Sequence, residues 1–433
     1  MPDHSAIIPG TGEREIAVAG QLLERVFSSR QAADRILDHH FRAEHTGQLE
    51  RRRLGALVYG VLRHRSLLQA ECEHYFPEVP PGSAVLAAMA LVMLARGSGV
   101  VLDPPWPPPL ANLAQVEDPL PQDLLPPWIK VSLPQWIWQH WSARFGGSET
   151  EALMHCMNTA AAVDVRVNIG KTTRDAVLEQ LRSLGVRAEP TPFSPDGCRL
   201  EGHPALVDHP SWRQGFLEVQ DEGSQIISHL VAPKPGMTVV DFCAGAGGKT
   251  LHMAALMRDR GRIWAVDTEV ERIRRMQPRI KRGGIRSIRT LVVRHEGDAG
   301  LKKLFQGAER VLVDVPCSAT GTLRRNPEIK WRLTPDQLET YHLRQCAIIQ
   351  AASRLVAPRG RLIYATCSLM ERENEAVVQG FLAENRNFRP VFPQTISTLG
   401  TLQRLLPPSP FFTLLPHRTG TDGFFAAILE RQS

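Results

Sequence analysis

Residues 241–250 read DFCAGAGGKT and follow Thr238–Phe242, a run with the composition of a buried strand. Glycines at this point let the backbone turn tightly and approach a ligand closely. The spacing does not match a phosphate loop, which needs four residues between its first glycine and its Gly-Lys pair, nor a dinucleotide fingerprint. The stretch predicts a site for a nucleoside with a short charged tail. A generic tight turn between strand and helix is the alternative.

More strands are predicted after this loop, and helical patterns separate most of them. Such alternation predicts a mostly parallel, doubly wound sheet, in which ligands bind at the carboxyl ends of the strands. The runs are Arg262–Val266, Thr290–Val293, Val311–Val315 and Arg361–Ala365. Asp267 and Asp298 follow the second and third strands, where one carboxylate could bind ribose hydroxyls and the other an exocyclic amine. Each could equally be a helix N-cap.

The fourth and fifth strands each deliver a cysteine to the same edge. Cys317 lies in the sequence DVPCS, which begins at Asp314, and Cys367 lies in the sequence ATCS. Neighbouring strands lie about 4.8 Å apart, so both thiols could face one pocket. Two buried structural cysteines are the alternative, because most free cysteines are small buried hydrophobes.

A cytosine suits this arrangement. Carbon 5 of the ring is not nucleophilic until a thiolate adds to carbon 6, after which it can attack a methyl sulfonium; such covalent catalysis divides one hard step into easier ones. The cysteine must be a thiolate, and the base must be single-stranded or flipped out of a duplex. Arg324, Arg325 and Lys330 stand near Trp331 in the next loop, where they would suit phosphates and a stacked base. An exposed charged loop is the alternative.

The chain divides into three regions. Residues 1–128 are predicted to form an all-helical domain that ends in a proline-rich linker, and residues 129–222 a small α+β module. In that module Ser132 is predicted as a helix N-cap, Val163–Ile169 as a strand and Thr173–Leu184 as a helix. Residues 223–433 form the α/β domain.

Composition excludes several classes. The chain has 433 residues, a net charge of +6 and seven scattered cysteines without a CxxC pair. We therefore expect free thiols and no metal site. The longest apolar run is too short to span a bilayer, and the N-terminus has no apolar core of a signal peptide, so a cytoplasmic location is expected. The basic stretch Arg262–Arg294 is compatible with nucleic acid, but a solvated helix face is the simpler interpretation.

Several motifs, taken in order, resemble those of the RsmB/NOP2/Sun family of RNA cytosine-5 methyltransferases. They are DFCAGAGGKT, the acid in AVDTEVERI, GDA, DVPCSATGTLRRNPEIKW, YATCSLMERENE and TDGFFAAILE. The lead-in LEVQDEGSQ also fits, and RRRLGALVYGVLR, residues 51–63, resembles the NusB-like domain of the bacterial RsmB branch. The resemblance implies a Rossmann-like class I methyltransferase fold with a NusB-like N-terminal domain. It also implies a role in ribosomal RNA processing.

The resemblance implies roles for individual residues. Cys367 would be the nucleophile and Cys317 would assist product release, with Asp314 at the cofactor and also at the cytosine. S-adenosylmethionine would be the cofactor, RNA the partner, with 16S ribosomal RNA expected ahead of transfer RNA, and the protein a monomer. The expected cofactor residues are Cys243, Ala244, Gly245, Ala246, Gly247, Gly248, Lys249, Asp267, Asp298 and Asp314, and the expected RNA-binding residues are Arg324, Arg325 and Lys330.

Departures and alternatives remain open. The family usually has proline where this chain has Ala246, and glycine where it has Ala319. Neither change removes a functional group, although either could shift substrate preference. The cysteine roles could be exchanged, as in DNA cytosine methyltransferases. A non-catalytic RNA-binding or assembly factor is a second alternative, and a nicotinamide-dependent oxidoreductase, disfavoured by the glycine spacing, is a third.

Overall fold

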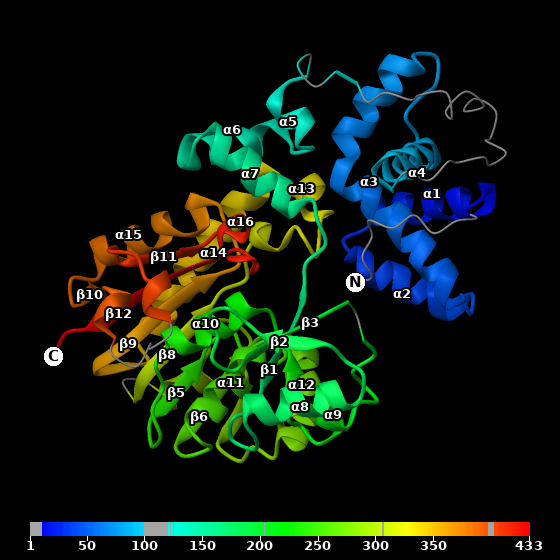
Figure 1. The fold of residues 1–433 in the computed structure, drawn as a ribbon. Coiled ribbons are helices and arrows are strands. Elements are labelled where there is room, and N and C mark those ends of the chain that lie inside the picture. Colours follow the sequence, from blue (N-terminus) through cyan, green and yellow to red (C-terminus); the bar gives the residue numbers. More distant parts are fainter. Residues whose placement is uncertain are drawn as a thin grey trace. The chain divides into compact units, whose positions relative to one another are not determined.

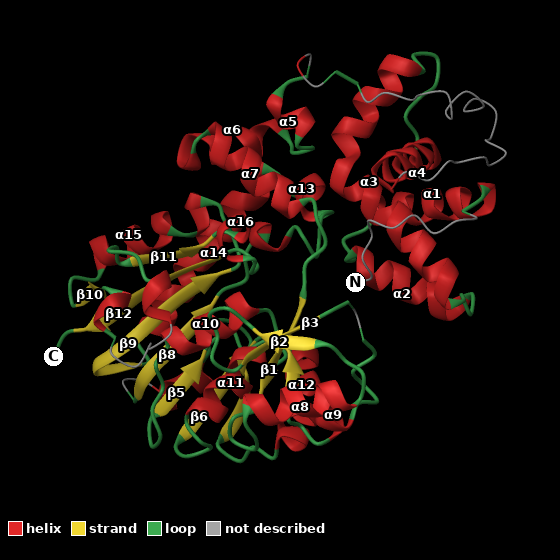
Figure 2. Cartoon of the chain, viewed as in Figure 1, coloured by secondary structure: helices red, strands yellow, loops and turns green. Residues whose placement is uncertain are grey.

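The computed structural model describes residues 11–98, 120–121, 123, 125–202, 204–304, 307–396 and 402–433. These form two compact units (Figures 1 and 2). Unit 1 contains Met1–Ala161 together with Thr322–Leu333, which we call the inserted segment; unit 2 contains Ala162–Gly321 and Thr334–Ser433. This division differs from the domain boundaries that the sequence predicted, which lie at 128/129 and 222/223. The predicted proline-rich linker lies largely outside the described residues.

Unit 1 is helical, as expected. The apolar positions that recur at helical spacing in its first helix, from Ile16 to Val26, are buried in a common core with those of the third helix, from Leu54 to Leu62. The helices are α1 (Glu13–Ser28), α2 (Ala33–Ala43), α3 (Gln48–Tyr75), α4 (Ser83–Ser98), α5 (Pro127–Lys130), α6 (Gln135–Phe145), α7 (Gly147–Met157) and α13 (Ile329–Arg332).

Helix α3 is kinked at His64, whose φ and ψ are −119° and 19°. A kink interrupts the ladder of backbone bonds, so the freed groups need other partners. The amide of Ser66 donates to Oγ of Ser132 at 2.9 Å. Ser132 was predicted as a helix N-cap, and this was wrong: α6 begins at Gln135, and Ser132, fully buried with a φ of +51°, serves the kink instead.

The inserted segment supplies the remaining partners of the kink. Nε1 of Trp331 donates to the carbonyl of Leu62 at 2.6 Å, and Nζ of Lys330 donates to the carbonyl of Arg63 at 2.7 Å and to Oδ1 of Asn158 at 2.9 Å. Lys330 is only 1% exposed. The prediction that Lys330 binds RNA is therefore wrong, because its ammonium is buried and forms hydrogen bonds inside unit 1.

The small α+β module was predicted for residues 129–222; its β part is a four-stranded antiparallel sheet of order β2-β3-β1-β4 that lies after Ala161. The predicted strand is β1 (Val163–Val167), and the predicted helix is α8 (Arg174–Ser183), capped by the Thr173 side chain. The other elements are β2 (Ala188–Pro190), β3 (Gly197–Leu200), β4 (Leu217–Val219) and α9 (Pro210–Arg213). We call this part of unit 2 the small module.

The larger sheet of unit 2 has the order β10-β12-β9-β8-β5-β6-β7, with β11 paired to β12. Strands β5 to β9 pair in parallel, and β12 is antiparallel to β9. All five predicted strands are present within a few residues of their predicted positions; the last three were not predicted. The strands are β5 (Thr238–Asp241), β6 (Arg262–Asp267), β7 (Ile288–Val292), β8 (Ala308–Asp314), β9 (Val356–Thr366), β10 (Phe388–Val391), β11 (Phe411–Leu414) and β12 (Phe424–Arg431).

Both faces of this sheet are covered, which makes it doubly wound. Alternation along β8 shows how: Leu312 packs with α10 (Glu222–Leu230), α11 (Gly248–Leu256) and α12 (Val270–Gly283), whereas Val311 and Val313 pack with α14 (Pro335–Ser353) and α15 (Glu375–Glu384). The strand order reverses beside β5, so the loop after β5 lies where ligands bind in such sheets. The short remaining elements are η3 (Ala299–Leu304), η4 (Thr320–Thr322), η5 (Glu371–Glu373), η6 (Pro393–Thr395) and α16 (Pro416–Thr419).

All seven cysteines are free thiols, as expected. In the described part of the chain, no helix combines the length and the apolar character that crossing a membrane requires.

Candidate active site

The glycine loop, residues 243–248, connects β5 to α11. Gly247 caps the helix with a φ of +86°, and a Cβ there would lie 2.5 Å from Cγ of Met276, so both conformation and space require glycine. The loop is fixed to β6, because the amide of Gly245 donates to Oδ2 of Asp267 at 2.8 Å. The first amides of α11 have no partner within the helix and mark its positive end, which suits a carboxylate.

Three carboxylates surround this loop. Asp241 ends β5, is buried, and accepts from the Thr250 hydroxyl at 2.6 Å, but its Oδ1 has no hydrogen-bond partner among the described residues. Burial raises the pKa of Asp241 to about 7. Burial and the charges of Asp241, Asp267 and Asp314 also raise the pKa of the Cys243 thiol well above its ordinary value. Cys243 is therefore uncharged, and the pocket favours a cation.

A cavity beside Cys243 is lined by residues from the ends of several strands. Cys243 and Asp267 were predicted to lie here, and neighbours that the sequence did not single out complete the lining. The lining residues are Phe242, Cys243, Asp267, Thr268, Glu269, Arg272, Val293, Glu296, Pro316, Arg344 and Ile348. Position after a strand end was the only signal that could have found Glu269, Arg272 and Glu296.

Asp298, expected at the cofactor, does not belong to the lining that the described residues form. Its carboxylate accepts from the backbone amides of Gly300 at 2.8 Å and Arg294 at 3.0 Å, and pairs with Nε of Arg294 at 3.2 Å. These bonds lower the pKa of Asp298 to about 2. The structure thus gives Asp298 a role in holding its own loop.

The two cysteines that follow β8 and β9 lie together. Because these strands are parallel neighbours with Asp314 opposite Ala365, their ends deliver Cys317 and Cys367 side by side, and the two Sγ atoms are 3.5 Å apart. The bond to Cys367 and burial raise the pKa of Cys317 well above its ordinary value. Cys317 is therefore a thiol at neutral pH and can donate to the sulfur of Cys367.

Lys249 brings a positive charge to the sulfur pair. Its Nζ lies 2.7 Å from Oδ2 of Asp314 and 5.2 Å from the ring centre of Phe424. Burial acts against the charge on Lys249, but Asp314 outweighs burial and the pKa of Lys249 is raised, with Cys367 acting in the same direction. Lys249 therefore stays charged and brings this charge close to the sulfur of Cys367.

Glu373 holds the two cysteine turns in place, although no role was predicted for this residue. It is fully buried. Its Oε1 accepts from the amide of Ser318 at 2.8 Å and from Nε2 of Gln345 at 2.9 Å, and its Oε2 accepts from the hydroxyls of Ser318 and Ser368. The serine after each cysteine thus binds one carboxylate, which fixes the distance between the turns.

The C-terminal motif TDGFF packs against the Cys317 turn. Gly321 donates from its amide to the carbonyl of Cys367 at 2.8 Å, and its own carbonyl accepts from the amide of Gly423 at 2.8 Å. Ala319, where the family usually has glycine, has a φ of +56°. An alanine methyl in this left-handed conformation adds backbone strain next to the sulfur pair.

Among the described residues, one group of three side chains could hold a metal ion: Asp196, His229 and His252. Nε2 of His229 and of His252 lie 3.0 and 3.1 Å from Oδ2 of Asp196. Burial lowers the pKa of His252 to about 3, so this ring is neutral. Coordination through Nε2 would place a proton on the buried Nδ1, which lacks a partner in the described structure. A carboxylate that accepts from the neutral His252 ring fits the group better.

Comparisons with known proteins find related sequences over much of the chain. Residues 228–430 match the family model described as 16S rRNA methyltransferase RsmB/F, and residues 133–206 match the ferredoxin-like domain model of RsmF/B-like methyltransferases. A Synechocystis protein named "Probable ribosomal RNA small subunit methyltransferase B" is 35% identical over 306 residues, which cover 70% of this chain and 67% of that protein. The ribosomal RNA small subunit methyltransferase B of Cronobacter sakazakii is 30% identical over 302 residues, covering 69% and 66%.

Solved structures share the fold. The crystal structure of PH0851 superposes with a TM-score of 0.78 at 25% identity and covers 98% of this chain and all of that one. The structure titled NSun6 from Pyrococcus horikoshii with SFG gives a TM-score of 0.60 at 20% identity, covering 69% of this chain and 98% of that one. The fold is therefore that of S-adenosylmethionine-dependent methyltransferases, with a helical N-terminal part.

Proposed function

Because the chain belongs to the RsmB/F family of 16S rRNA methyltransferases, we propose that it methylates carbon 5 of a cytosine in small-subunit ribosomal RNA through a covalent adduct with Cys367. The observation that carries the proposal is the sulfur pair at 3.5 Å, placed beside a charged lysine in the first turn of α11, directly after the glycine loop. Without the resemblance to a family, this geometry alone would still favour attack by one thiolate supported by a neighbouring thiol.

The residues around the glycine loop fit S-adenosylmethionine. When bound, this cofactor supplies an electrophilic methyl group on a positively charged sulfur. The free Oδ1 of Asp241 and the carboxylates of Asp267 and Asp314 suit its positive charges, and the start of α11 suits its carboxylate. The cavity beside Cys243 offers room for the nucleoside, with Asp267 positioned for ribose hydroxyls.

The protein groups then have distinct roles. Cys367 attacks carbon 6 of the cytosine as a thiolate, and the charge of Lys249 stabilises that thiolate. Asp314 faces the ring and holds Lys249 in place. After carbon 5 has been methylated, a base such as water takes its proton and the electrons of that bond restore the double bond between carbons 5 and 6. The bond between sulfur and carbon 6 then breaks and its electrons return to the sulfur. Cys317 carries a proton and lies 3.5 Å away, so it can donate a hydrogen bond to the departing sulfur.

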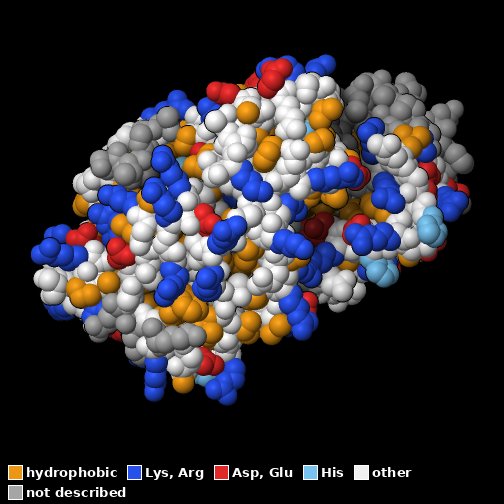
Figure 3. Space-filling model, turned by 90° about the horizontal axis from the view of Figure 1, so that it is seen from below, with side chains coloured by type: hydrophobic (Ala, Val, Ile, Leu, Met, Phe, Trp, Pro, Cys, Tyr) orange, Lys and Arg blue, Asp and Glu red, His pale blue; other side chains and the backbone are white. Residues whose placement is uncertain are grey.

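Basic side chains outside the cysteine site are proposed to bind the RNA backbone. Arg324 and Arg325 stay candidates in the inserted segment, although Nη2 of Arg324 already donates to the carbonyl of Ala160 at 2.7 Å. In unit 2 the exposed side of α12 carries Arg272, Arg274 and Arg275. Lysine and arginine side chains are spread over much of the face drawn in Figure 3. Such a surface attracts phosphates without reading sequence.

The experiment that tests the proposal is a trap. RNA carrying 5-fluorocytosine cannot lose the group on carbon 5, so the enzyme stays attached to it. In the presence of S-adenosylmethionine, we expect a covalent complex on a denaturing gel with the wild type and with Cys317→Ala, and none with Cys367→Ala. Parallel arms with 16S ribosomal RNA and with transfer RNA identify the substrate class.

Each other outcome contradicts a defined part of the proposal. A complex with Cys367→Ala but not with Cys317→Ala would exchange the two roles. Absence of any complex, together with no binding of S-adenosylmethionine in calorimetry, would favour an RNA-binding assembly factor. A complex formed with transfer RNA alone would move the activity to that substrate.

A further inference from the structure

One face of the sheet in the small module is buried although it is polar. Val165 and Val167 of β1 point into the core of the module, whereas Asp164 and Arg166 alternate with them and lie on the opposite face. Both are only 2% exposed. Charged side chains are buried only where other groups satisfy them, so this face must have partners in the rest of unit 2.

Arg166 reaches the glycine loop. Its Nη1 donates to the carbonyl of Gly248 at 2.6 Å and to Oε1 of Gln220, the residue after β4, at 2.6 Å. Burial lowers the pKa of Arg166 to about 10, which leaves the guanidinium charged at neutral pH. The charged guanidinium of Arg166 thus binds the carbonyl of Gly248 and the side-chain amide of Gln220.

A second arginine binds the same loop from α12. Nη1 of Arg279 donates to the carbonyl of Ala246 at 2.6 Å, and its Nε donates to Oε2 of Glu218 at 3.0 Å. Glu218 lies directly opposite Arg166 in the sheet register. Ala246 occupies the position where the family usually has proline, so here an arginine restrains a loop that lacks the rigid ring.

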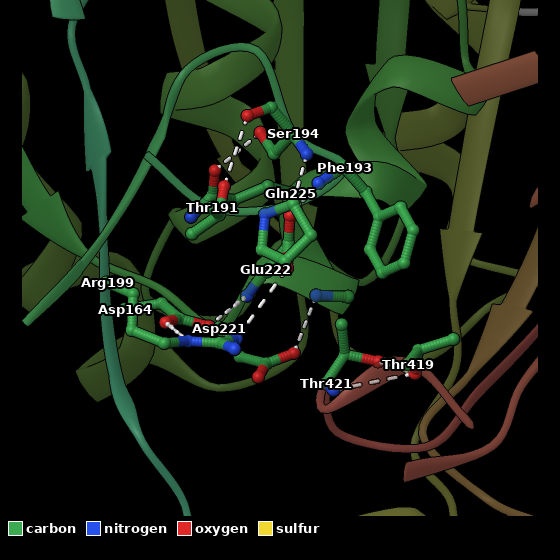
Figure 4. Close-up of polar contacts among 12 residues, drawn as sticks. Asp164, Thr191, Phe193, Ser194, Arg199, Asp221, Glu222, Gln225, Thr419 and Thr421 are labelled. Carbon is green, nitrogen blue, oxygen red and sulfur yellow. Dashed lines mark hydrogen bonds and ion pairs between the residues drawn. The ribbon is translucent and has the colours of Figure 1, made fainter. Parts of the chain in front are cut away.

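The polar face of the small module is held by ion pairs within the module and by hydrogen bonds to α10 (Figure 4). Arg199 of β3 makes two bonds to Asp164, at 2.8 and 3.1 Å. Glu222, the first residue of α10, accepts from the amides of Phe193 and Ser194 at 2.6 and 2.7 Å, and it is fully buried. These contacts keep Arg166 at a fixed distance from the glycine loop.

We propose that the small module is a structural part of the cofactor site, with Arg166 and Arg279 as positioning residues. By holding the carbonyls of Ala246 and Gly248 on one side of the loop, they keep the amides at the start of α11 free for the cofactor carboxylate. A carbonyl that could rotate inward would repel that carboxylate, and preorganised donors bind better than mobile ones. The inference rests on the proposed binding of S-adenosylmethionine at this loop.

The test uses the full chain and calorimetric titration with S-adenosylmethionine in the absence of RNA. We expect Arg166→Met and Arg279→Met each to weaken binding at least tenfold. Arg282→Met is the matched control: Arg282 also pairs with Glu218 and packs on the Trp212 ring, but its contacts among the described residues do not include the loop. We expect it to bind within twofold of the wild type. At saturating cofactor, the kcat of Arg279→Met should stay near that of the wild type while its KM for S-adenosylmethionine rises.

Thermal melting without ligand separates a positioning role from general damage. If Arg166→Met does not fold, Arg279→Met and the charge-preserving Arg166→Lys carry the test, and Arg166→Lys should recover part of the affinity. Equal affinity in all variants would overturn the inference and leave the proposed function intact. A loss in Arg282→Met equal to that in Arg279→Met would also overturn it. Absence of binding by the folded wild type would instead contradict the proposed function, and with it the premise of the inference.

Discussion

At the scale of single residues, folding changes the ionisation of Asp241. Its pKa is raised from 3.8 to about 7, chiefly by burial. The folded protein therefore holds this proton more tightly than the unfolded chain does. The stability that results is complete below pH 3.8 and is lost as the pH rises towards 7.

Asp241→Asn should remove this dependence. We expect the unliganded variant to gain stability relative to the wild type as the pH rises from 5 to 8, by up to a few kcal/mol, since each pKa unit corresponds to about 1.4 kcal/mol. The measurement is urea denaturation of both proteins at several pH values. A difference between them that does not change with pH would show that Asp241 ionises normally in the folded protein.

The sequence was sufficient to predict site residues that directly follow a strand. It was not sufficient for polar residues in loops whose side chains are buried in the fold. Cys317 and Cys367 could be placed together because parallel strands align their ends. Glu373 could not be singled out, because it stands in a charged stretch and only the fold reveals that both cysteine turns bind it. Lys330 misled for a similar reason: a lysine beside a tryptophan in a polar loop gives no sign that it is buried.

At the scale of elements, the kink of α3 depends on groups distant in the chain. Ser132→Ala would leave the amide of Ser66 without its partner inside unit 1. An unsatisfied, partly buried donor costs about 1–3 kcal/mol. We expect urea denaturation of the full chain to show this loss for Ser132→Ala. Ser183→Ala is the matched control, because its hydroxyl is exposed and binds only its own helix turn, and it should change stability by less than about 0.5 kcal/mol.

Elements were predictable in proportion to their periodicity. The helices of unit 1 and strands β5 to β9 carry clear 3.6-residue or apolar patterns. Strands β10, β11 and β12 were not predicted, since they pair antiparallel at the far end of the sheet and interrupt the alternation of strand and helix. The kink at His64 has no proline to announce it, and the nearest glycine in α3, Gly60, lies a full turn before it.

At the scale of the whole molecule, the inserted segment belongs to unit 1, although the chain before and after it belongs to unit 2. A fragment of residues 162–433 would retain Trp331 and Lys330 without the carbonyls that they bind. We expect this fragment to aggregate in size-exclusion chromatography, and a version with residues 322–333 replaced by a Gly/Ser linker to give a larger monomeric fraction. Identical elution of the two fragments would contradict this expectation.

The same arrangement has a consequence for how such a protein can evolve. The backbone passes between the units at 161/162, 321/322 and 333/334. A single genetic crossover at 161/162 or at 321/322 would join a helical part from one parent to an inserted segment from the other. Lineages that exchange domains by recombination would then separate Trp331 and Lys330 from the kinked helix that they complete. The two units are therefore constrained to be inherited together, although each has a hydrophobic core of its own.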